Sequence, residues 1–200
     1  MGLYIDEEFT WKYHIEQVAT KISKMTGIMA KARHYLSLKT LQTIYDTMVY
    51  PYLTYCNIVW TSTYPSRLKS LFILQKKIVR IMTFAKYKEK SRPLFLSLKI
   101  LNIYELNVYL MALFMYSYFS DNLPSYFTNY FKLNEMIHSH NTRSASNIFI
   151  DYKRTNYGKF SLKFRGAQIW NKLPKDLKIL KSYSLFKKSA KVYVQNNMNP

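Results

Sequence analysis

The sequence predicts a mainly α-helical protein, and three observations support this fold class. Apolar residues recur at three- and four-residue steps along most of the chain, which is the spacing of one face of a helix. Glycine (4) and proline (6) are scarce among the 200 residues, which disfavours turn-dense all-β folds. Hydrophobic residues make up 48% of the chain, so we expect a buried core and not a disordered protein.

The first part of the chain predicts a short strand followed by a long helix. Residues 2–6 alternate briefly between side-chain types, which is typical of a strand. A strand needs partners, so we expect this one to be the end of a larger sheet. Thr10 is a suitable N-cap for the helix that follows. Apolar residues from Trp11 to Met29 form the stripe that this helix would bury.

Proline residues divide the next helical stretch. Ser37 can cap a second helix, which Pro51 breaks or kinks because proline lacks a backbone N–H group. A short helical piece then continues to Trp60. Pro65 opens a third helix, since proline is tolerated in the first turn. The basic link over residues 86–93 is the expected boundary between two subdomains.

The second half of the chain predicts further helices and one small β element. A hairpin near residues 148–162 would pair 148–150 with 160–162 around the turn Asn156-Tyr157-Gly158. The helices expected in this half cover residues 94–101, 104–119, 163–172 and 183–195. The predicted division of the chain is a strand remnant at 1–9, a helical domain at 10–90 and a mixed helical domain at 91–200.

Basic residues outnumber acidic ones, 30 to 11, which gives a formal net charge of +19 at pH 7. They are concentrated in two blocks: residues 65–100 contain ten basic and one acidic residue, and residues 132–200 contain fourteen and three. The segment between the blocks is nearly uncharged and apolar. A cation excess of this size attracts polyanions, because neutralising phosphates releases condensed counterions. We therefore expect two binding surfaces around a shared core.

The first basic block predicts contacts with a phosphate backbone. The polar side of the third helix carries a basic stripe that only Ile73 interrupts, and no acidic residue compensates it. The candidate residues of this helix and of the link that follows are Lys69, Lys76, Lys77, Arg80, Lys86, Lys88 and Arg92. The ordinary alternative is a solvated helix face without a ligand.

The second basic block alternates cations with aromatic rings. This pattern suits single-stranded nucleic acid, because charge follows the backbone while rings stack on bases. The candidate cations are Arg143, Lys153, Arg154, Lys159, Lys163 and Arg165, and the rings between them are Tyr152, Tyr157, Phe160 and Phe164. The alternative is a basic hairpin whose rings face the core.

Patterns for catalysis and metal binding are missing from the sequence. A single cysteine, Cys56, excludes an intrachain disulfide and a cysteine-rich zinc site, and it suits a reducing compartment. The acidic cluster Asp6-Glu7-Glu8 is interpreted as an exposed strand end, not a metal site. His138 and His140 are interpreted as surface residues, because structural zinc sites need four ligands. We expect no catalytic residues, no cofactor and no metal.

The N-terminal residues do not resemble a signal peptide, and the most apolar run, 108–119, is too short to span a membrane. We therefore expect an intracellular protein, cytoplasmic or nuclear and not secreted, without a membrane partner.

Several stretches resemble the reverse transcriptases of non-LTR (LINE-type, jockey-like) retrotransposons. GLYIDEEFTWKYHI resembles the segment that closes the palm and enters the thumb. YDTMVYPYLTYCNIVW and LFILQKKIVRIMT resemble the helices that follow. HSHNTRSASN and RTNYGKFSLKFRGAQIWNKLP resemble the C-terminal end. Together these stretches cover nearly the whole chain, and their order and spacing make the resemblance specific.

The resemblance implies a thumb and a C-terminal region that hold template–primer and engage element RNA. It also implies no synthesis by this chain alone, because the family's polymerase holds two metal ions on palm aspartates. No Asp-Asp pair occurs here, the fingers and most of the palm are absent, and the single cysteine excludes a CCHC zinc knuckle. RNA or DNA is the expected partner, together with the missing polymerase portion.

Other interpretations remain open. One is a basic helical module that binds an acidic protein partner, and another is peripheral binding to an anionic membrane. A third is a decayed element product with no selected function.

Overall fold

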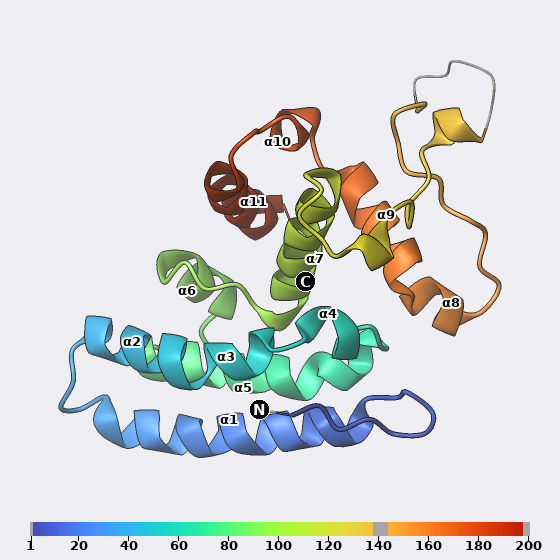
Figure 1. Ribbon diagram of the computed structural model, residues 1–200. Helices are drawn as coiled ribbons and strands as arrows, with labels where there is room; N and C mark the ends of the chain where they lie inside the picture. Colours follow the sequence, from blue (N-terminus) through green and yellow to red (C-terminus); the bar gives the residue numbers. More distant parts are fainter. Residues whose placement is uncertain (1, 138–143, 198–200) are drawn as a thin grey trace. The chain divides into compact units, whose positions relative to one another are not determined.

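The computed structural model describes residues 2–137 and 144–197, which fall into two compact units. Unit 1 ends at Asn107 and unit 2 begins at Val108, so the division lies within one helix. The described residues are mainly helical and contain no β-sheet (Figure 1). This confirms the predicted fold class, whereas the predicted strand and hairpin are absent from the described residues.

Unit 1 is built around two long helices. Helix α1 packs along α5, and α2 packs against both of them. Side chains from all three helices are fully buried between them, including Ile22, Leu41, Leu71 and Ile78. The helices of this unit are α1 (Lys12–Ala32), α2 (Leu38–Met48), α3 (Tyr50–Thr54), α4 (Asn57–Trp60), α5 (Pro65–Thr83), α6 (Ser91–Ser97) and the first turn of α7 (Ile103–Phe119).

The predicted helix cap and two prolines of unit 1 have the effects on helix ends that the sequence indicated. The Oγ atom of Ser37 accepts a hydrogen bond from the N–H of Thr40, as an N-cap should. Helix α2 ends before Pro51, and the short helix α3 carries this proline in its first turn. Pro65 is the first residue of α5, as predicted.

The strand predicted over residues 2–6 is wrong. The Asp6 carboxylate accepts a hydrogen bond from the N–H of Thr10, and the Asp6 carbonyl accepts one from the N–H of Phe9. These bonds close a turn before α1. The helix begins at Lys12, and the residue at its N-cap is Trp11 in a left-handed conformation, one position later than predicted.

Unit 2 buries residues of α7, α9 and α11 together. Phe186 of α11 is fully buried and stacks on Tyr116 of α7, with ring centroids 4.3 Å apart. Trp170 of α9 lies against the same Phe186 ring. The further helices of this unit are η1 (Ser125–Phe127), η2 (Asn134–Met136), α8 (Asn156–Phe160), α9 (Leu162–Lys172), α10 (Lys175–Lys178) and α11 (Tyr183–Asn197). The closing helices were therefore predicted to within about two residues, which is the usual uncertainty of helix ends.

The predicted hairpin near residues 148–162 is also wrong. The residues expected to form its turn belong to α8, where the hydroxyl of Thr155 accepts a hydrogen bond from the N–H of Gly158. Ser161 caps α9 in the same way. Two N-caps therefore direct this segment into helices. Ile148, which was expected to lie in the first strand of the hairpin, forms an isolated antiparallel bridge with Leu133 instead.

Candidate nucleic-acid interface

The basic stripe of α5 lies on the side of the helix opposite its buried residues. Lys69 and Lys77 are exposed, and neither pairs with a carboxylate in the part of the chain that the structure describes. Ile73, between them in sequence, is 50% exposed. The helix therefore presents two free ammonium groups, with an apolar side chain on the same face.

The other two cations of α5 are partly used within the fold. Lys76 is half-buried, and its Nζ lies 4.5 Å from the centre of the Phe72 ring, in a cation–π contact. Arg80 donates two hydrogen bonds to the backbone carbonyl of Glu89, at 2.9 and 3.3 Å. Arg80 thus fastens the basic link to the end of α5.

The link forms a turn that presents one ring between two cations. The carboxylate of Glu89 accepts a hydrogen bond from the N–H of Lys86 at 3.2 Å, which closes the turn. Lys86 and Lys88 are exposed, and Tyr87 between them is 89% exposed. The hydrogen bonds from Arg80 to Glu89 and from Lys86 to Glu89 hold the link beside the last turn of α5. The cations of the link and those at the end of α5 therefore belong to one surface of unit 1.

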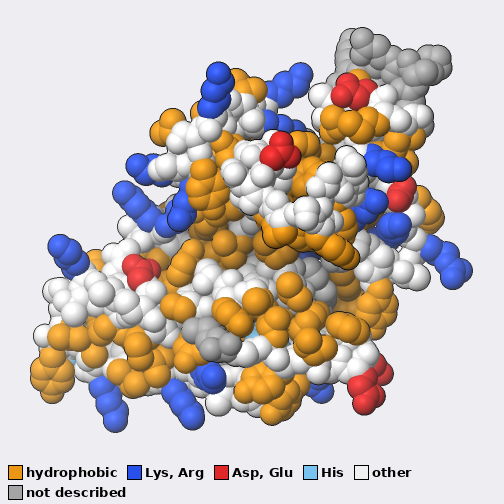
Figure 2. Space-filling view, in the orientation of Figure 1, with side chains coloured by type: hydrophobic (Ala, Val, Ile, Leu, Met, Phe, Trp, Pro, Cys, Tyr) orange, Lys and Arg blue, Asp and Glu red, His pale blue; other side chains and the backbone are white. Residues whose placement is uncertain are grey.

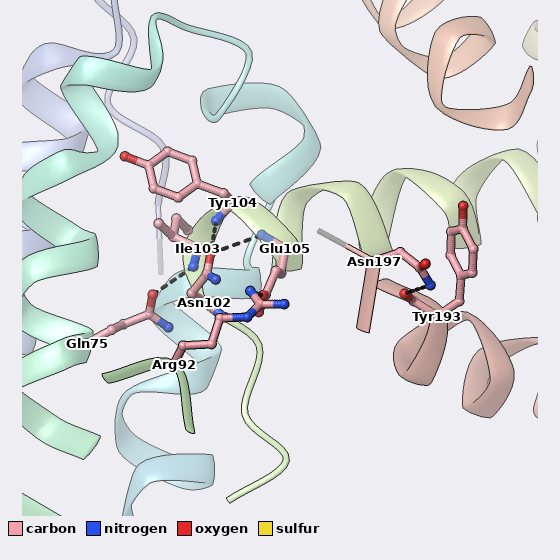
Figure 3. Close-up of polar contacts among 8 residues, drawn as sticks. All are labelled: Gln75, Arg92, Asn102, Ile103, Tyr104, Glu105, Tyr193 and Asn197. Atoms are coloured by element: carbon pink, nitrogen blue, oxygen red, sulfur yellow. Dashed lines mark hydrogen bonds and ion pairs between the residues drawn. The ribbon is translucent and has the colours of Figure 1, made fainter. Parts of the chain in front are cut away.

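Arg92 has a different environment. Its guanidinium forms an ion pair with Glu105 at 2.8 Å, and the Glu105 side chain is only 3% exposed. This bond joins the start of α6 to the start of α7 (Figure 3). Burial raises the pKa of the Glu105 carboxyl, and the charge of Arg92 and hydrogen bonds from Asn102 and Arg92 oppose this rise. The predicted binding residue Arg92 is therefore committed to an internal contact.

The same carboxylate completes the cap of α7. Glu105 accepts a hydrogen bond from the N–H of Asn102, while the Asn102 side chain accepts bonds from the N–H groups of Tyr104 and Glu105. Gln75 of α5 accepts a bond from the N–H of Ile103 at 2.7 Å (Figure 3). The first N–H groups of this buried helix end are thus satisfied, which fixes the first turn of α7 against α5 within unit 1.

The second predicted cluster lies in unit 2, on and before α8 and α9. Arg154, Lys159 and Lys163 are exposed, and no described carboxylate pairs with them. Lys153 forms an ion pair with Asp151 at 3.8 Å, and both side chains are partly exposed. The position of Arg143 lies outside the described residues.

Arg165 and the rings of this cluster divide between surface and interior. Arg165 is half-buried, and burial lowers the pKa of its guanidinium. Tyr152 and Tyr157 are 89% and 62% exposed, so their ring faces are accessible. Phe160 and Phe164 are only half-exposed. Accessible rings therefore alternate with cations over residues 152–157, as expected. The rings of Phe160 and Phe164 are partly covered and are less able to stack on a base.

A third group of cations, which the sequence interpretation missed, lies on α10, on α11 and in the connection between them. The buried side of α11 is formed by Phe186, Ala190 and Val194, and its lysines lie on other sides of the helix. No described carboxylate pairs with these cations. The group consists of Lys175, Lys178, Lys181, Lys187, Lys188 and Lys191.

Two lysines of this group, Lys175 and Lys178, are close enough for the charge of one to affect the other. Burial lowers the pKa of Lys178, and the charge of Lys175 lowers it further. Figure 2 shows Lys and Arg side chains projecting around α10 and α11 and around α8, with few acidic side chains on the face drawn. The spacing of Lys187, Lys188 and Lys191 on a helix without acidic residues was a signal that could have identified the group.

The residues considered for metal binding in the sequence do not form a site in the described parts of the chain. Within residues 2–137 and 144–197, no three His, Cys, Asp or Glu side chains come together in a way that could hold a metal ion. His138 and His140 lie outside those ranges. Cys56 is exposed, in the turn between α3 and α4. None of the helices in the described chain combines the length and apolarity needed to cross a membrane.

Comparisons with protein-family models, with curated proteins and with solved structures find no match to this chain.

Proposed function

We propose that this chain binds nucleic acid through its basic surfaces, without sequence specificity and without catalysing synthesis. The observation that carries the proposal is the set of exposed lysines on α5 and the following link, which have no carboxylate partner among the described residues. An ordinary solvated helix balances its cations with acidic residues at three- or four-residue spacing, and α5 contains none.

Template–primer or element RNA is the proposed partner. This part of the proposal rests on the sequence resemblance to the thumb and C-terminal region of non-LTR retrotransposon reverse transcriptases. The exposed cations support it through a general mechanism, since each phosphate that a lysine neutralises releases counterions and favours binding. The exposed rings of Tyr87, Tyr152 and Tyr157, next to cations, add surfaces on which unpaired bases can stack.

The experiment is a salt titration of binding. Fluorescence anisotropy of labelled duplex DNA and single-stranded RNA gives the affinity at several salt concentrations. In the double variant Lys69→Gln/Lys77→Gln, we expect the slope of log affinity against log salt to fall by about two units, close to one per lost phosphate contact.

The matched control is Lys24→Gln/Lys31→Gln, which removes two exposed lysines from α1 in the same unit. An equal fall in the slope for both variants would show that overall charge, and not the α5 surface, drives binding. Acidic peptides and acidic liposomes serve as competitors. If either displaces the protein from RNA and duplex at equal anionic charge, a nucleic-acid function is contradicted.

Absence of synthesis is tested separately. The purified chain is incubated with template–primer, deoxynucleotides and Mg²⁺ or Mn²⁺, and extension of the primer is measured. We expect none, since no Asp-Asp pair is present to hold the two metal ions of a polymerase.

A further inference from the structure

Unit 2 contains a pocket that none of the predicted binding residues explains. Its volume is about 610 Å³, within the range of small-ligand sites. It is formed by the end of α7 and by the segment that follows, up to η2. All of its lining residues belong to unit 2.

Aromatic rings form much of the pocket wall. Four of them line it: Tyr118, Phe119, Phe127 and Phe131. Phe119 is 40% exposed, and one of its faces stacks on Trp170 at 4.9 Å. Phe127 is half-buried and is held by edge contacts with Phe114 and Tyr130. The rings are therefore fixed in position by their neighbours, so they offer a preformed apolar surface to a planar group.

The two charged residues of the pocket have opposite charges. Asp121 and Lys132 both line it, and both are exposed. Neither side chain has a hydrogen-bond or ion-pair partner among the described residues. A carboxylate can accept hydrogen bonds from the N–H groups of a base edge, and an ammonium group can pair with a phosphate.

A second cation lies beside the same wall. The Nζ atom of Lys163 is 5.8 Å from the centre of the Tyr130 ring. Tyr130 in turn packs against Phe127 and Phe131, with ring centroids 5.7 and 5.1 Å away. Lys163 is one of the predicted binding residues, so the pocket adjoins a surface already proposed to contact phosphates.

We propose that this pocket receives one unstacked base of a single-stranded nucleic acid, an inference that rests on the proposed function. The base stacks on the accessible part of the aromatic wall, at Phe119 and Phe127, and its N–H groups donate to the carboxylate of Asp121. The flanking phosphates lie outside, near Lys132 and Lys163. The base and not a phosphate lies beside Asp121, because this carboxylate would repel a phosphate.

The test compares two RNA oligonucleotides of equal length and charge, one with all its bases and one with several abasic positions. We expect the complete strand to bind roughly tenfold or more tightly, which corresponds to the stacking of one base. In the variant Phe127→Leu, which keeps an apolar side chain but removes the ring, this ratio should fall, and the part that remains is the stacking of bases on the exposed tyrosines of the basic surfaces.

The control variant is Tyr35→Leu. Tyr35 lies in unit 1, is 88% exposed and does not line the pocket. Its replacement should leave the ratio unchanged, and an equal loss in both variants overturns the pocket assignment. Circular dichroism and thermal melting of both variants show whether the fold is intact.

The two proposals fail in different ways. If both oligonucleotides bind with equal affinity, the pocket inference is wrong while the proposed function stands. If neither binds, both are wrong.

Discussion

The side-chain amide of Asn171 hydrogen-bonds both backbone groups of Ile148. Its Nδ2 donates to the carbonyl oxygen at 2.8 Å, and its Oδ1 accepts from the N–H at 2.9 Å. Ile148 is only 1% exposed, so these groups have no access to water. The amide takes the place of a neighbouring strand and ties the segment before α8 to α9.

Replacing Asn171 with Leu should destabilise unit 2. The change leaves a buried N–H and a buried carbonyl of Ile148 without their partner, which costs about 1–3 kcal/mol. Urea unfolding followed by circular dichroism measures the loss. The control is Asn197→Leu, because the Asn197 amide donates to the exposed carbonyl of Tyr193 (Figure 3), and we expect a change below about 0.5 kcal/mol. Equal losses in the two variants would contradict the proposed role of Asn171.

Replacing Gly166 and Gly27 with alanine should change the stability of the protein in opposite directions. A Cβ at Gly166 would lie 2.8 Å from the Met115 sulfur and 3.2 Å from Phe131, so overpacking should cost about 1–3 kcal/mol. A Cβ at Gly27, in the middle of α1, meets nothing within 4 Å, so Gly27→Ala should add about 0.5–1 kcal/mol of stability. Thermal melting of both variants tests the pair. A neutral Gly166→Ala would show that Met115 moves aside without cost.

Glu105 should make unit 1 less stable as pH rises. Burial raises its pKa in the folded state above the ordinary value of 4.5, so the folded chain binds more protons than the unfolded one between pH 4.5 and the raised pKa. The free energy of unfolding therefore contains a contribution that is present below pH 4.5 and is lost as pH rises through the raised pKa. The variant Glu105→Gln should remove this dependence. Arg92→Gln should strengthen it, because the ion pair that opposes the shift is lost.

His14 should have the opposite effect on the pH dependence of stability, so that unit 1 becomes more stable as pH rises. Its imidazole is 4% exposed and lies against Trp60, and burial lowers its pKa below 6.5, with a smaller effect from Lys21. The unfolded chain then binds the extra proton, so the stability contribution of His14 is present above pH 6.5 and is lost as pH falls through the lowered pKa. His14→Phe keeps a ring against Trp60 and should abolish this loss in a pH series of urea unfolding. His34→Phe, at an exposed position, is the control.

The lysines of α11 provide a test of the third basic group. Lys187→Gln/Lys191→Gln removes two exposed charges four residues apart on one helix. If the group contacts phosphates, the slope of log affinity against log salt should fall by about two units. An unchanged slope would remove α11 from the interface.

Much of the helical architecture could be predicted from single residues. Ser37, Pro51 and Pro65 act through their own backbone and side-chain chemistry, so their effects do not depend on distant parts of the chain. The hairpin prediction failed because an Asn-Tyr-Gly sequence also fits the first turn of a helix, and the Thr155 cap decides between the two. This cap was visible in the sequence.

The site was harder to predict. The pairing of Arg92 with Glu105 joins residues on different helices, so spacing along one helix could not reveal it. The pocket depends on how a segment without regular pattern folds back on the end of α7. The α11 lysines, by contrast, follow an ordinary helical spacing and could have been recognised.

Cys56 has a practical consequence for measurements on this protein. Its thiol is exposed, and the sequence contains no other cysteine with which it could pair. An oxidant can therefore join two molecules through a single covalent bond. Such a linked pair carries twice the cations of one chain, so it would bind polyanions more tightly and with a steeper response to ionic strength. Affinities measured with and without a reducing agent would then describe different species.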